Sequence, residues 1–255
     1  MPRFEPSIVD ALKILPEVLI SSARGERKLD EALLTPSANL LLGLVKILVS
    51  NGTSLAEIVS ALSGQQASAD GHVASELRNF FDSEFIATAR VLCVTTNHSN
   101  EAMWANYTEN HKGCVLGFRH IATLSTPLLA AKKVVYSKQL PVVGSGIDFL
   151  LYGNTKELRE STIDAVCFTK KSAWLYEQEW RAVTWRPEEG ESQFGDYKFY
   201  PDELESVTLG IKASAQTEAT VMQLLKRMYQ NCKLFRLASV HGETSRMPVN
   251  IAGTQ

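Results

Sequence analysis

The segment AWLYEQEWRAV at residues 173–183 alternates aromatic side chains with charged ones. A segment that only fills a core uses its aromatic residues for burial and keeps charges on the solvent side, whereas the wall of a ligand cleft can use both kinds. If residues 179–185 form a strand, Glu179 and Arg181 lie on the same face, because side chains alternate between the two faces of a sheet. A guanidinium group holds a neighbouring carboxylate ionised and fixes its direction. The pair can therefore orient a ribose hydroxyl, act as a base, or bind a phosphate through the arginine.

Further charged groups flank this pair. Glu177 offers a second carboxylate, and FTKKSAW immediately upstream adds Lys170 and Lys171. The same residues also fit a structural role, since an ion pair at a surface contributes only about 0 to 1 kcal/mol and needs no function to explain it. Two interpretations of the segment stay open, a binding cleft and an ordinary ion pair on a sheet.

A second segment, MWANYTENHKG at residues 103–113, carries an aromatic stripe. In a helix that opens after the cap candidates at 97–99 and stops at Gly113, Trp104, Tyr107 and His111 fall at positions i, i+3 and i+7, on one face. Such a face can stack a base or a nicotinamide ring, with the imidazole as acid, base or hydrogen-bond donor. The alternative is a core-facing stripe with a histidine that the helix dipole favours near the C-terminus.

The composition argues against several classes of protein. Of the 255 residues, 45% are hydrophobic and 21% are charged, and the net charge is -2, so we expect a folded chain without bulk attraction to nucleic acid or to an anionic membrane. The longest apolar run, ANLLLGLVKILV, is interrupted by Lys46 and is too short to span a bilayer, and the first residues do not resemble a secretory signal. We therefore expect a cytoplasmic location. No metal site is expected, because the cysteines are far apart in the sequence: Cys93, Cys114, Cys167 and Cys232.

Hydrophobic spacing divides the chain into two parts. Residues 6–88 place apolar residues at three-and-four spacing, which predicts helices over SIVDALKILPEVL, ANLLLGLVKILVS, SLAEIVSALSG and ASELRNFFDSEFIATA, with a loop at 63–72. Gly52 is expected to stop one helix, and Thr53 or Ser54 is expected to cap the next, with Glu57 placed for a capping box if Ser54 is the cap. From Arg90 onward, short β-branched runs predict strands: RVLCVTT, GCVLGF, KKVVY, AVCFTK, EWRAVTW, SVTLGI and KLFRLAS. The helical segment AQTEATVMQLLKRMYQ joins the last two of them.

These elements predict an α+β fold. A helical N-terminal region at 1–88 would pack on a mixed β-sheet domain at 89–245 that carries the site, and residues 246–255 would form a loose tail.

The order of the motifs resembles a bacterial family, domain of unknown function 2971. The segments that carry the resemblance are VLCVTTNHSNEAMWANYTENHKGCVLGF, KKVVYS, CFTKKSAWLYEQEWRAV and LESVTLGI, within residues 90–211. By position, the residues that match the family pattern are Trp104, Tyr107, His111, Gly113, Gly117, Tyr136, Lys171, Trp174, Tyr176, Glu177, Glu179 and Arg181. The N-terminal part diverges, since residues 1–88 lack the family's Tyr-rich first strand and its Asn-Asp-Pro-Phe-Glu motif.

The resemblance implies a function class and a set of roles. The family layout is similar to the split sheet of ADP-ribosyltransferases, which cradle NAD and use a glutamate. On that basis Glu179, Glu177 and His111 are the expected catalytic residues, and the expected substrate-binding residues are Trp104, Tyr107, Lys171, Trp174, Tyr176 and Arg181. The implied activity is that of an NAD- or nucleotide-using transferase or glycohydrolase in bacterial defence or toxin systems, with NAD as substrate and no cofactor assigned.

Two other function classes stay open. One is a non-catalytic module of a defence system that binds a ligand or a partner protein. The other is a nucleic-acid enzyme with a local basic track, although the net charge disfavours nucleic acid as a partner. The residues of that track would be Lys132, Lys133, Lys170, Lys171, Lys226 and Arg227.

Overall fold

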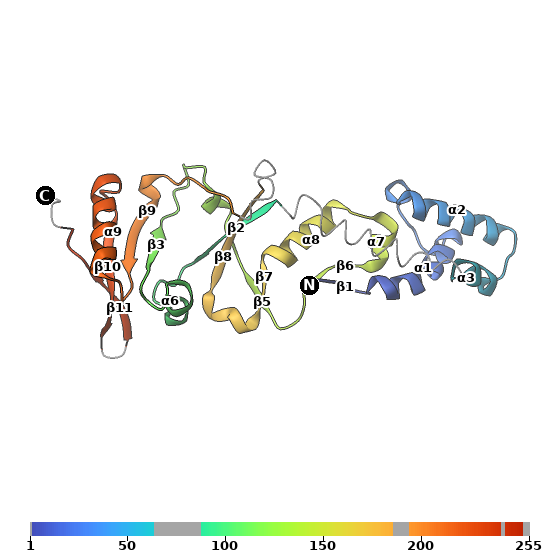
Figure 1. The fold of residues 1–255 in the computed structure, drawn as a ribbon. Helices are drawn as coiled ribbons and strands as arrows, with labels where there is room; N and C mark the ends of the chain where they lie inside the picture. The colour runs from blue at the N-terminus through green and yellow to red at the C-terminus, as the bar shows by residue number, and fades with distance from the viewer. Residues whose placement is uncertain (1, 64–87, 186–193, 241–242, 252–255) are drawn as a thin grey trace. The chain divides into compact units, whose positions relative to one another are not determined.

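The computed structural model describes residues 2–63, 88–185, 194–240 and 243–251. Figure 1 shows helices and strands in an α+β fold, which confirms the predicted fold class. The chain divides into two compact units. The first contains Met1–Thr88 and Ser137–Thr169, and the second contains Ala89–Tyr136 and Lys170–Gln255.

The first unit is mainly helical. Its helices are α1 (Ile8–Ala23), α2 (Pro36–Ser50), α3 (Leu55–Ser63), α7 (Gly146–Tyr152) and α8 (Lys156–Cys167), with a short 3-10 turn, η1 (Glu31–Leu33). Two short parallel strands complete the unit: β1 (Arg3–Phe4) and β6 (Val142–Gly144). Buried aliphatic side chains from α1, α2, α3 and α7 form its main core, including Leu19, Leu42, Val45, Ile58 and Leu151.

Local signals define the helix ends of this unit as the sequence predicts. The backbone N–H of Ser54 donates to Glu57 over 3.0 Å and the N–H of Glu57 donates to Ser54 over 3.3 Å, which confirms the capping box before α3. Gly52 follows α2 with a φ of 75°, and its N–H donates to the carbonyl of Val49. A glycine adopts this left-handed conformation without the penalty of a Cβ atom, so α2 ends where Gly52 was expected to stop it.

The second unit contains two sheets. One has the strand order β11-β10-β9-β3, and its members are β3 (Cys114–Phe118), β9 (Leu204–Leu209), β10 (Lys233–Val240) and β11 (Glu243–Pro248). The other has the order β2-β8-β4, with β2 (Ala89–Thr95), β4 (Lys132–Lys133) and β8 (Glu179–Trp185). A further pair of strands consists of β5 (Val135–Ser137) and β7 (Thr169–Lys171). The boundaries between the two units lie within these strands, after Tyr136 and after Thr169. The remaining elements are α6 (Glu101–Tyr107), α9 (Ala215–Met228), η2 (Pro127–Ala130), η3 (Ser172–Glu177) and η5 (Pro201–Glu203).

The four-stranded sheet is built on a strand, helix, strand unit. β9 and β10 are parallel and α9 connects them, as the sequence predicts. Leu225 of α9 packs against Val207, Leu209 and Leu234 of the sheet, which forms the core of this part of the molecule. β11 pairs antiparallel with β10 from Val240↔Glu243 to Phe235↔Pro248. The expected loose tail at 246–255 therefore begins inside a strand, because the β10 edge offers a hydrogen-bonding partner as far as Pro248.

The structure differs from the sequence predictions in three further places. Residues 137–169 group with the N-terminal helices, not with the expected sheet domain at 89–245, because β6 pairs with β1. The expected strand AVCFTK is mostly the end of α8, which runs to Cys167, and only Thr169–Lys171 is extended. The helix expected to stop at Gly113 ends at Tyr107, and its cap is Asn100, whose side chain accepts the N–H of Met103.

Two predictions fall mainly on residues outside the described ranges. They are the helix over ASELRNFFDSEFIATA, of which residues 74–87 are not described, and the loop at 63–72, of which residues 64–72 are not described. Among the helices that are described, none has the length and apolarity needed to cross a membrane.

Candidate functional site

Strand β8 positions the Glu179 and Arg181 pair. It pairs with β2 on one side and β4 on the other, with Glu179 opposite Thr95 and Arg181 opposite both Cys93 and Lys132. Arg181 Nη2 lies 2.8 Å from Glu179 Oε2, so the two side chains form the expected ion pair on one face of the strand. Glu179 is only 5% exposed. A carboxylate at this depth requires cationic partners, and Arg181 is the first of them.

Glu177 lies at the end of η3 and is fully buried. Gln178, between the two glutamates, has a φ of 48° in the left-handed region, so the chain turns sharply before β8 begins. Because of this turn, Glu177 and Glu179 reach the same cation from different elements. The left-handed residue is unusual outside glycine and carries a conformational cost, which the ion pairs on either side offset.

Lys170 is that shared cation. Its Nζ forms a salt bridge with Glu177 Oε2 and lies 3.3 Å from Glu179 Oε2. Burial lowers the pKa of Lys170, but the hydrogen bond that Lys170 donates to Glu177 and the charge of Glu179 outweigh it, so the pKa is raised above its usual value. The ammonium group also lies 5.0 Å from the centre of the Trp174 ring. Lys170, Glu177, Glu179 and Arg181 together are called the ion cluster below.

Tyr107, at the end of α6, contacts the ion cluster through Glu177. Its hydroxyl donates to Glu177 Oε1 over 2.8 Å, while the residue as a whole is 61% exposed. The hydrogen bond to Glu177 is the main cause of a raised pKa for the Tyr107 phenol. The α6 cap residue Asn100 donates to the backbone carbonyl of Tyr176, which also ties α6 to η3. The two sequence segments that we singled out therefore meet in the structure.

Trp104 and His111 lie in a different setting from Tyr107. Trp104 is 2% exposed, and its indole N–H donates to the carbonyl of His98 over 2.8 Å. The His111 ring stacks on the Trp104 ring at 6.4 Å with an interplanar angle of 7°. His111 Nδ1 is buried and has no hydrogen-bond partner among the described residues. Trp104 therefore belongs to the interior, and the His111 backbone is tied to the residues that follow β9, since its carbonyl accepts the N–H of Lys212.

The chain between α6 and β3 is strained. Glu109, Asn110 and His111 all have positive φ values, of 50°, 55° and 69°. The turn is held by the Thr108 hydroxyl, which donates to the Trp104 carbonyl over 2.5 Å. His111 therefore reaches Trp104 through a left-handed turn and not along a continuous helix, and Tyr107 is left free to reach Glu177.

Several residues of the site were not predicted as site residues. Lys170 takes the place expected for Lys171, which is exposed and contacts none of the ion cluster in the described structure. Tyr136 accepts the backbone N–H of Glu179 at its hydroxyl over 2.9 Å, and it was known only as a residue of the family pattern. Cys93 lies next to the ion cluster, and burial and the charge of Glu179 raise the pKa of its thiol. Cys93 is brought to the ion cluster because β2 pairs with β8 so that Cys93 lies opposite Arg181. A single sequence does not predict which residues of two strands lie opposite each other.

The expected aromatic residues of η3 border the ion cluster. Trp174 is 41% exposed and lies beside Tyr176, with 6.0 Å between ring centres. Asn106 of α6 donates to the Tyr176 hydroxyl over 3.5 Å. Together with Tyr107 these rings give the site an accessible aromatic border around a buried, charged centre.

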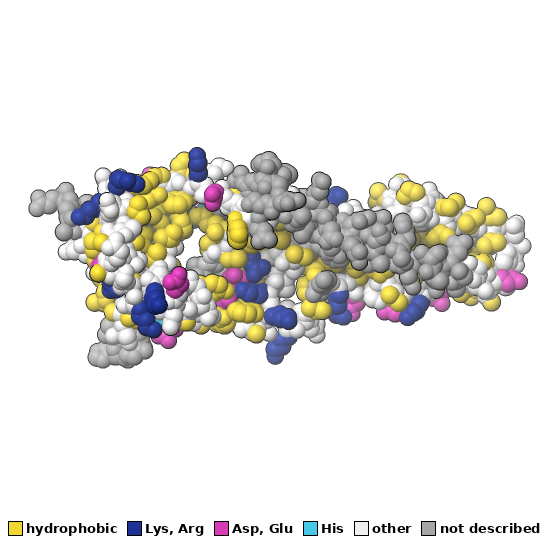
Figure 2. All heavy atoms as spheres, viewed as in Figure 1, with side chains coloured by type: hydrophobic (Ala, Val, Ile, Leu, Met, Phe, Trp, Pro, Cys, Tyr) yellow, Lys and Arg dark blue, Asp and Glu magenta, His cyan; other side chains and the backbone are white. Residues whose placement is uncertain are grey.

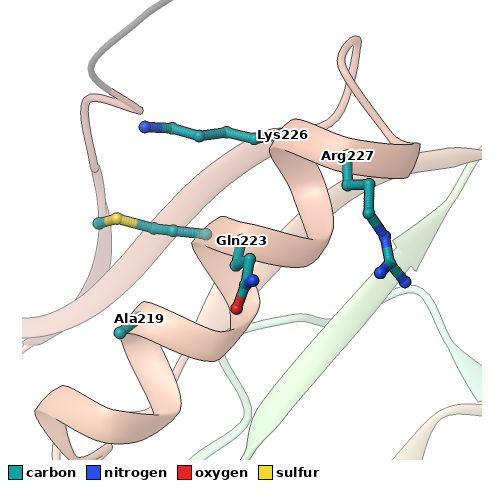
Figure 3. A pocket seen from close by; sticks show the side chains of 5 residues that line it. Ala219, Gln223, Lys226 and Arg227 are labelled. Atoms are coloured by element: carbon teal, nitrogen blue, oxygen red, sulfur yellow. The ribbon is translucent and has the colours of Figure 1, made fainter.

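The surface of the second unit is mixed in charge. On the face in Figure 2, acidic and basic side chains are interspersed, and an opening bordered by hydrophobic side chains lies between β3 and β9 on one side and β2 and β8 on the other. A separate cavity of about 530 Å³ lies on α9, lined by Ala219, Met222, Gln223, Lys226 and Arg227. Lys226 and Arg227 leave the helix in different directions (Figure 3). This cavity shares no residue with the ion cluster and has no acidic group in its described lining.

The geometry limits what the ion cluster can do. Its two acids and two bases balance in charge, and Glu177 is fully buried. Glu179 is the carboxylate closer to the surface, with side-chain exposures of 7% for Glu179 and 14% for Arg181. Such a carboxylate, fixed between two cations, can orient a hydroxyl or stabilise a developing positive charge.

Comparison with curated proteins and with solved structures gave no match to this chain. A family model described as "Protein of unknown function (DUF2971)" matches residues 103–182. The match begins in α6 and ends in β8, so it includes Tyr107 and every residue of the ion cluster. The resemblance drawn from the motifs is thereby confirmed over residues 103–182, which match the DUF2971 family model.

Proposed function

We propose that this chain is a glutamate-dependent enzyme that acts on NAD or a related nucleotide, as a transferase or a glycohydrolase. The observation that carries the proposal is the setting of Glu179. It is paired with Lys170 and Arg181 at the edge of a site that has exposed aromatic rings. This combination suits a substrate with a planar base, a ribose and a phosphate group.

In the proposed reaction, the bond between the nicotinamide nitrogen and C1′ of the ribose breaks, and nicotinamide leaves with the bonding electron pair. Positive charge develops on the ribose, and the Glu179 carboxylate stabilises it and accepts a hydrogen bond from a ribose hydroxyl. Water or an acceptor group then attacks C1′ and releases its proton. Arg181 would hold the diphosphate, as a guanidinium group suits phosphate oxygens.

Burial and contacts support a narrower set of roles than the sequence left open. Tyr107 is accessible for stacking on a base, whereas Trp104 is buried and supports α6 from within. Glu177 supports Tyr107 and Lys170, which leaves Glu179 as the carboxylate to meet substrate. His111 and Lys171 make no described contact with the ion cluster, so the proposal gives them no chemical step.

The test combines binding and turnover. A thermal-shift panel would contain NAD, ADP-ribose, ATP, cyclic nucleotides and a short RNA, and release of nicotinamide from NAD would be followed separately. A ligand at about 100 times its Kd stabilises the folded state by roughly 2.7 kcal/mol, a rise in Tm of several degrees. We expect this shift with NAD or ADP-ribose, its loss in Tyr107→Ala, and the loss of nicotinamide release in Glu179→Gln.

A matched control separates stacking from a general effect of removing an aromatic ring. Phe194 is 83% exposed and belongs to the same unit, so Phe194→Ala should keep the shift. Trp104→Ala is a poor probe of binding, because emptying a buried aromatic site costs about 3 to 5 kcal/mol of stability. Wild-type protein that neither shifts with NAD or ADP-ribose nor releases nicotinamide would refute the proposal.

A second candidate function is a non-catalytic module that binds a ligand or a partner protein in a defence system. The full burial of Glu177 and the charge balance of the ion cluster favour it, since both suit a structural network. It predicts a ligand-induced shift without turnover. A nucleic-acid enzyme has less support, because acidic and basic side chains are interspersed on the face in Figure 2. That function predicts a steep salt dependence of RNA or DNA affinity.

A further inference from the structure

We infer that Lys170 is the positioning residue of this site, a single ammonium group that Glu177 and Glu179 share and that couples Tyr107 to the Glu179 carboxylate. The inference rests on the proposed function only in naming Glu179 as the carboxylate that meets substrate. The coupling itself follows from the contacts.

The contacts form a chain across the site. The Tyr107 hydroxyl donates to Glu177 Oε1 over 2.8 Å, and Lys170 Nζ binds the other oxygen of Glu177. The same Nζ lies 3.3 Å from Glu179 Oε2, which Arg181 Nη2 also contacts at 2.8 Å. Lys170 is the only described residue that bonds to both carboxylates, so the two halves of the chain meet at its ammonium group.

The surroundings of Lys170 hold the ammonium group in place. The Trp174 ring lies 5.0 Å from Nζ, and the Lys170 side chain is only 20% exposed. An ammonium group is a compact point charge with three donors, and here two of its directions point to carboxylates. The neighbouring Lys171 cannot replace it, because consecutive side chains of the strand β7 point to opposite faces.

Charge accounting explains why one lysine suits this position. Without Lys170, the fully buried Glu177 would keep only the Tyr107 hydroxyl among its described side-chain partners, and Glu179 would keep Arg181. A buried carboxylate without a cation is strongly unfavourable. Glu177 would then lose one of the two side chains that fix its position, and its hydrogen bond from Tyr107 would be its remaining described side-chain contact.

The experiment measures the coupling without any ligand. Protein labelled with ¹³C at the tyrosine ζ carbon is titrated by NMR, and the spectrum of Tyr107→Phe identifies the Tyr107 signal. The variants are Lys170→Met, Lys170→Arg and a control, Lys46→Met, which breaks the exposed Lys46–Glu31 pair of the other unit. If Lys170→Met does not fold, Lys170→Gln takes its place, since it keeps a donor without the charge.

The expected result follows from the charges near the phenol. Glu177 raises the pKa of Tyr107 and Lys170 lowers it. Removing the lysine should therefore move the Tyr107 titration further up, by about 1 pH unit, because a nearby cation favours the phenolate. Lys170→Arg and Lys46→Met should titrate as the wild type does. A Tyr107 titration that is the same in Lys170→Met and wild type would overturn the inference.

Turnover distinguishes this inference from the proposed function. With NAD as substrate, Lys170→Met should lower kcat by about 10- to 100-fold with a smaller change in KM, and Lys170→Arg should restore part of the loss. An equal kcat in Lys170→Met and wild type would refute the positioning role. Wild-type protein without NAD turnover would refute the proposed function, while the NMR titration would still decide whether Lys170 couples Tyr107 to the glutamates.

Discussion

The hydroxyl of Tyr107 donates a hydrogen bond of 2.8 Å to the carboxylate of Glu177, which lies 70 residues later in the chain. The two partners differ sharply in accessibility, since Tyr107 is 61% exposed and Glu177 is fully buried. A ligand can therefore contact the tyrosine ring without reaching the acid that holds it. This asymmetry divides the two glutamates into a supporting residue, Glu177, and a residue closer to the surface, Glu179.

The first prediction concerns the ranking of the two glutamates. Glu177→Gln should lower the free energy of unfolding by about 3 kcal/mol, because it breaks a buried ion pair. Glu179→Gln should lower it by about 1 to 2 kcal/mol, since the amide oxygen still accepts hydrogen bonds from Arg181 and Lys170. Nicotinamide release should show the opposite order, with the greater loss in Glu179→Gln.

Urea unfolding of both variants and an assay of nicotinamide release check this ranking. If Glu179→Gln costs more stability than Glu177→Gln and leaves turnover unchanged, Glu179 belongs to a structural ion pair and the assignment of roles is wrong.

The second prediction is a loss of stability in alkaline solution. The folded state raises the pKa of Tyr107 above 10.0 and that of Lys170 above 10.5. The folded protein therefore holds these protons more tightly than the unfolded chain does, and its free energy of unfolding falls as pH rises from about 10 through the raised values. Tyr107→Phe removes one titrating group and should make the decline shallower.

Chemical unfolding between pH 8 and pH 11 measures this dependence. Tyr200→Phe is a control, since Tyr200 is also exposed, at 50%, and its hydroxyl makes no described hydrogen bond. An equal decline in Tyr107→Phe and wild type would contradict the prediction.

Local patterns in the sequence predicted part of this site. Alternation along a strand places Glu179 and Arg181 on one face, and β8 has that geometry. Strand alternation does not predict that Glu177 also contacts Lys170, because the left-handed Gln178 interrupts the alternation. The choice between Lys170 and Lys171 was also beyond a local pattern, since β7 has only three residues and its face is fixed by partners elsewhere in the chain.

Non-local pairing explains what the sequence did not predict about the fold. The grouping of residues 137–169 with the N-terminal helices depends on β6 pairing with β1. The contact between Tyr136 and the backbone of Glu179 likewise joins residues 43 positions apart. The early end of α6 is followed by the positive φ values of Glu109 and His111. Positive φ values are uncommon outside glycine, so the sequence did not predict this turn.

The third prediction uses two glycines with opposite environments. A Cβ atom on Gly210 would lie 2.1 Å from the carbonyl oxygen of His111, so Gly210→Ala should lower stability by about 3 kcal/mol or more. A Cβ atom on Gly43, within α2, meets nothing within 4 Å among the described residues. Gly43→Ala should raise stability by about 0.5 to 1 kcal/mol, because alanine favours a helix.

Thermal unfolding of both variants tests the packing of the His111 turn against the sheet. If Gly210→Ala is as stable as the wild type, Gly210 and the His111 carbonyl do not approach each other as closely as described.

The fourth prediction concerns the left-handed turn after α6. A non-glycine residue in this conformation costs roughly 1 to 2 kcal/mol, and Glu109 is exposed, so its side chain contributes little packing in return. Glu109→Gly should raise the free energy of unfolding by about 0.5 to 1 kcal/mol, after allowing for the greater entropy of glycine in the unfolded chain. Glu109→Val should lower it, because a β-branched side chain fits this conformation poorly. Ala105→Gly, at an exposed position of α6, is the matched control and should be destabilising by about 0.5 to 1 kcal/mol. Urea unfolding of the three variants gives the comparison, and a loss of stability in Glu109→Gly as large as that in Ala105→Gly would mean that residue 109 is not left-handed in solution.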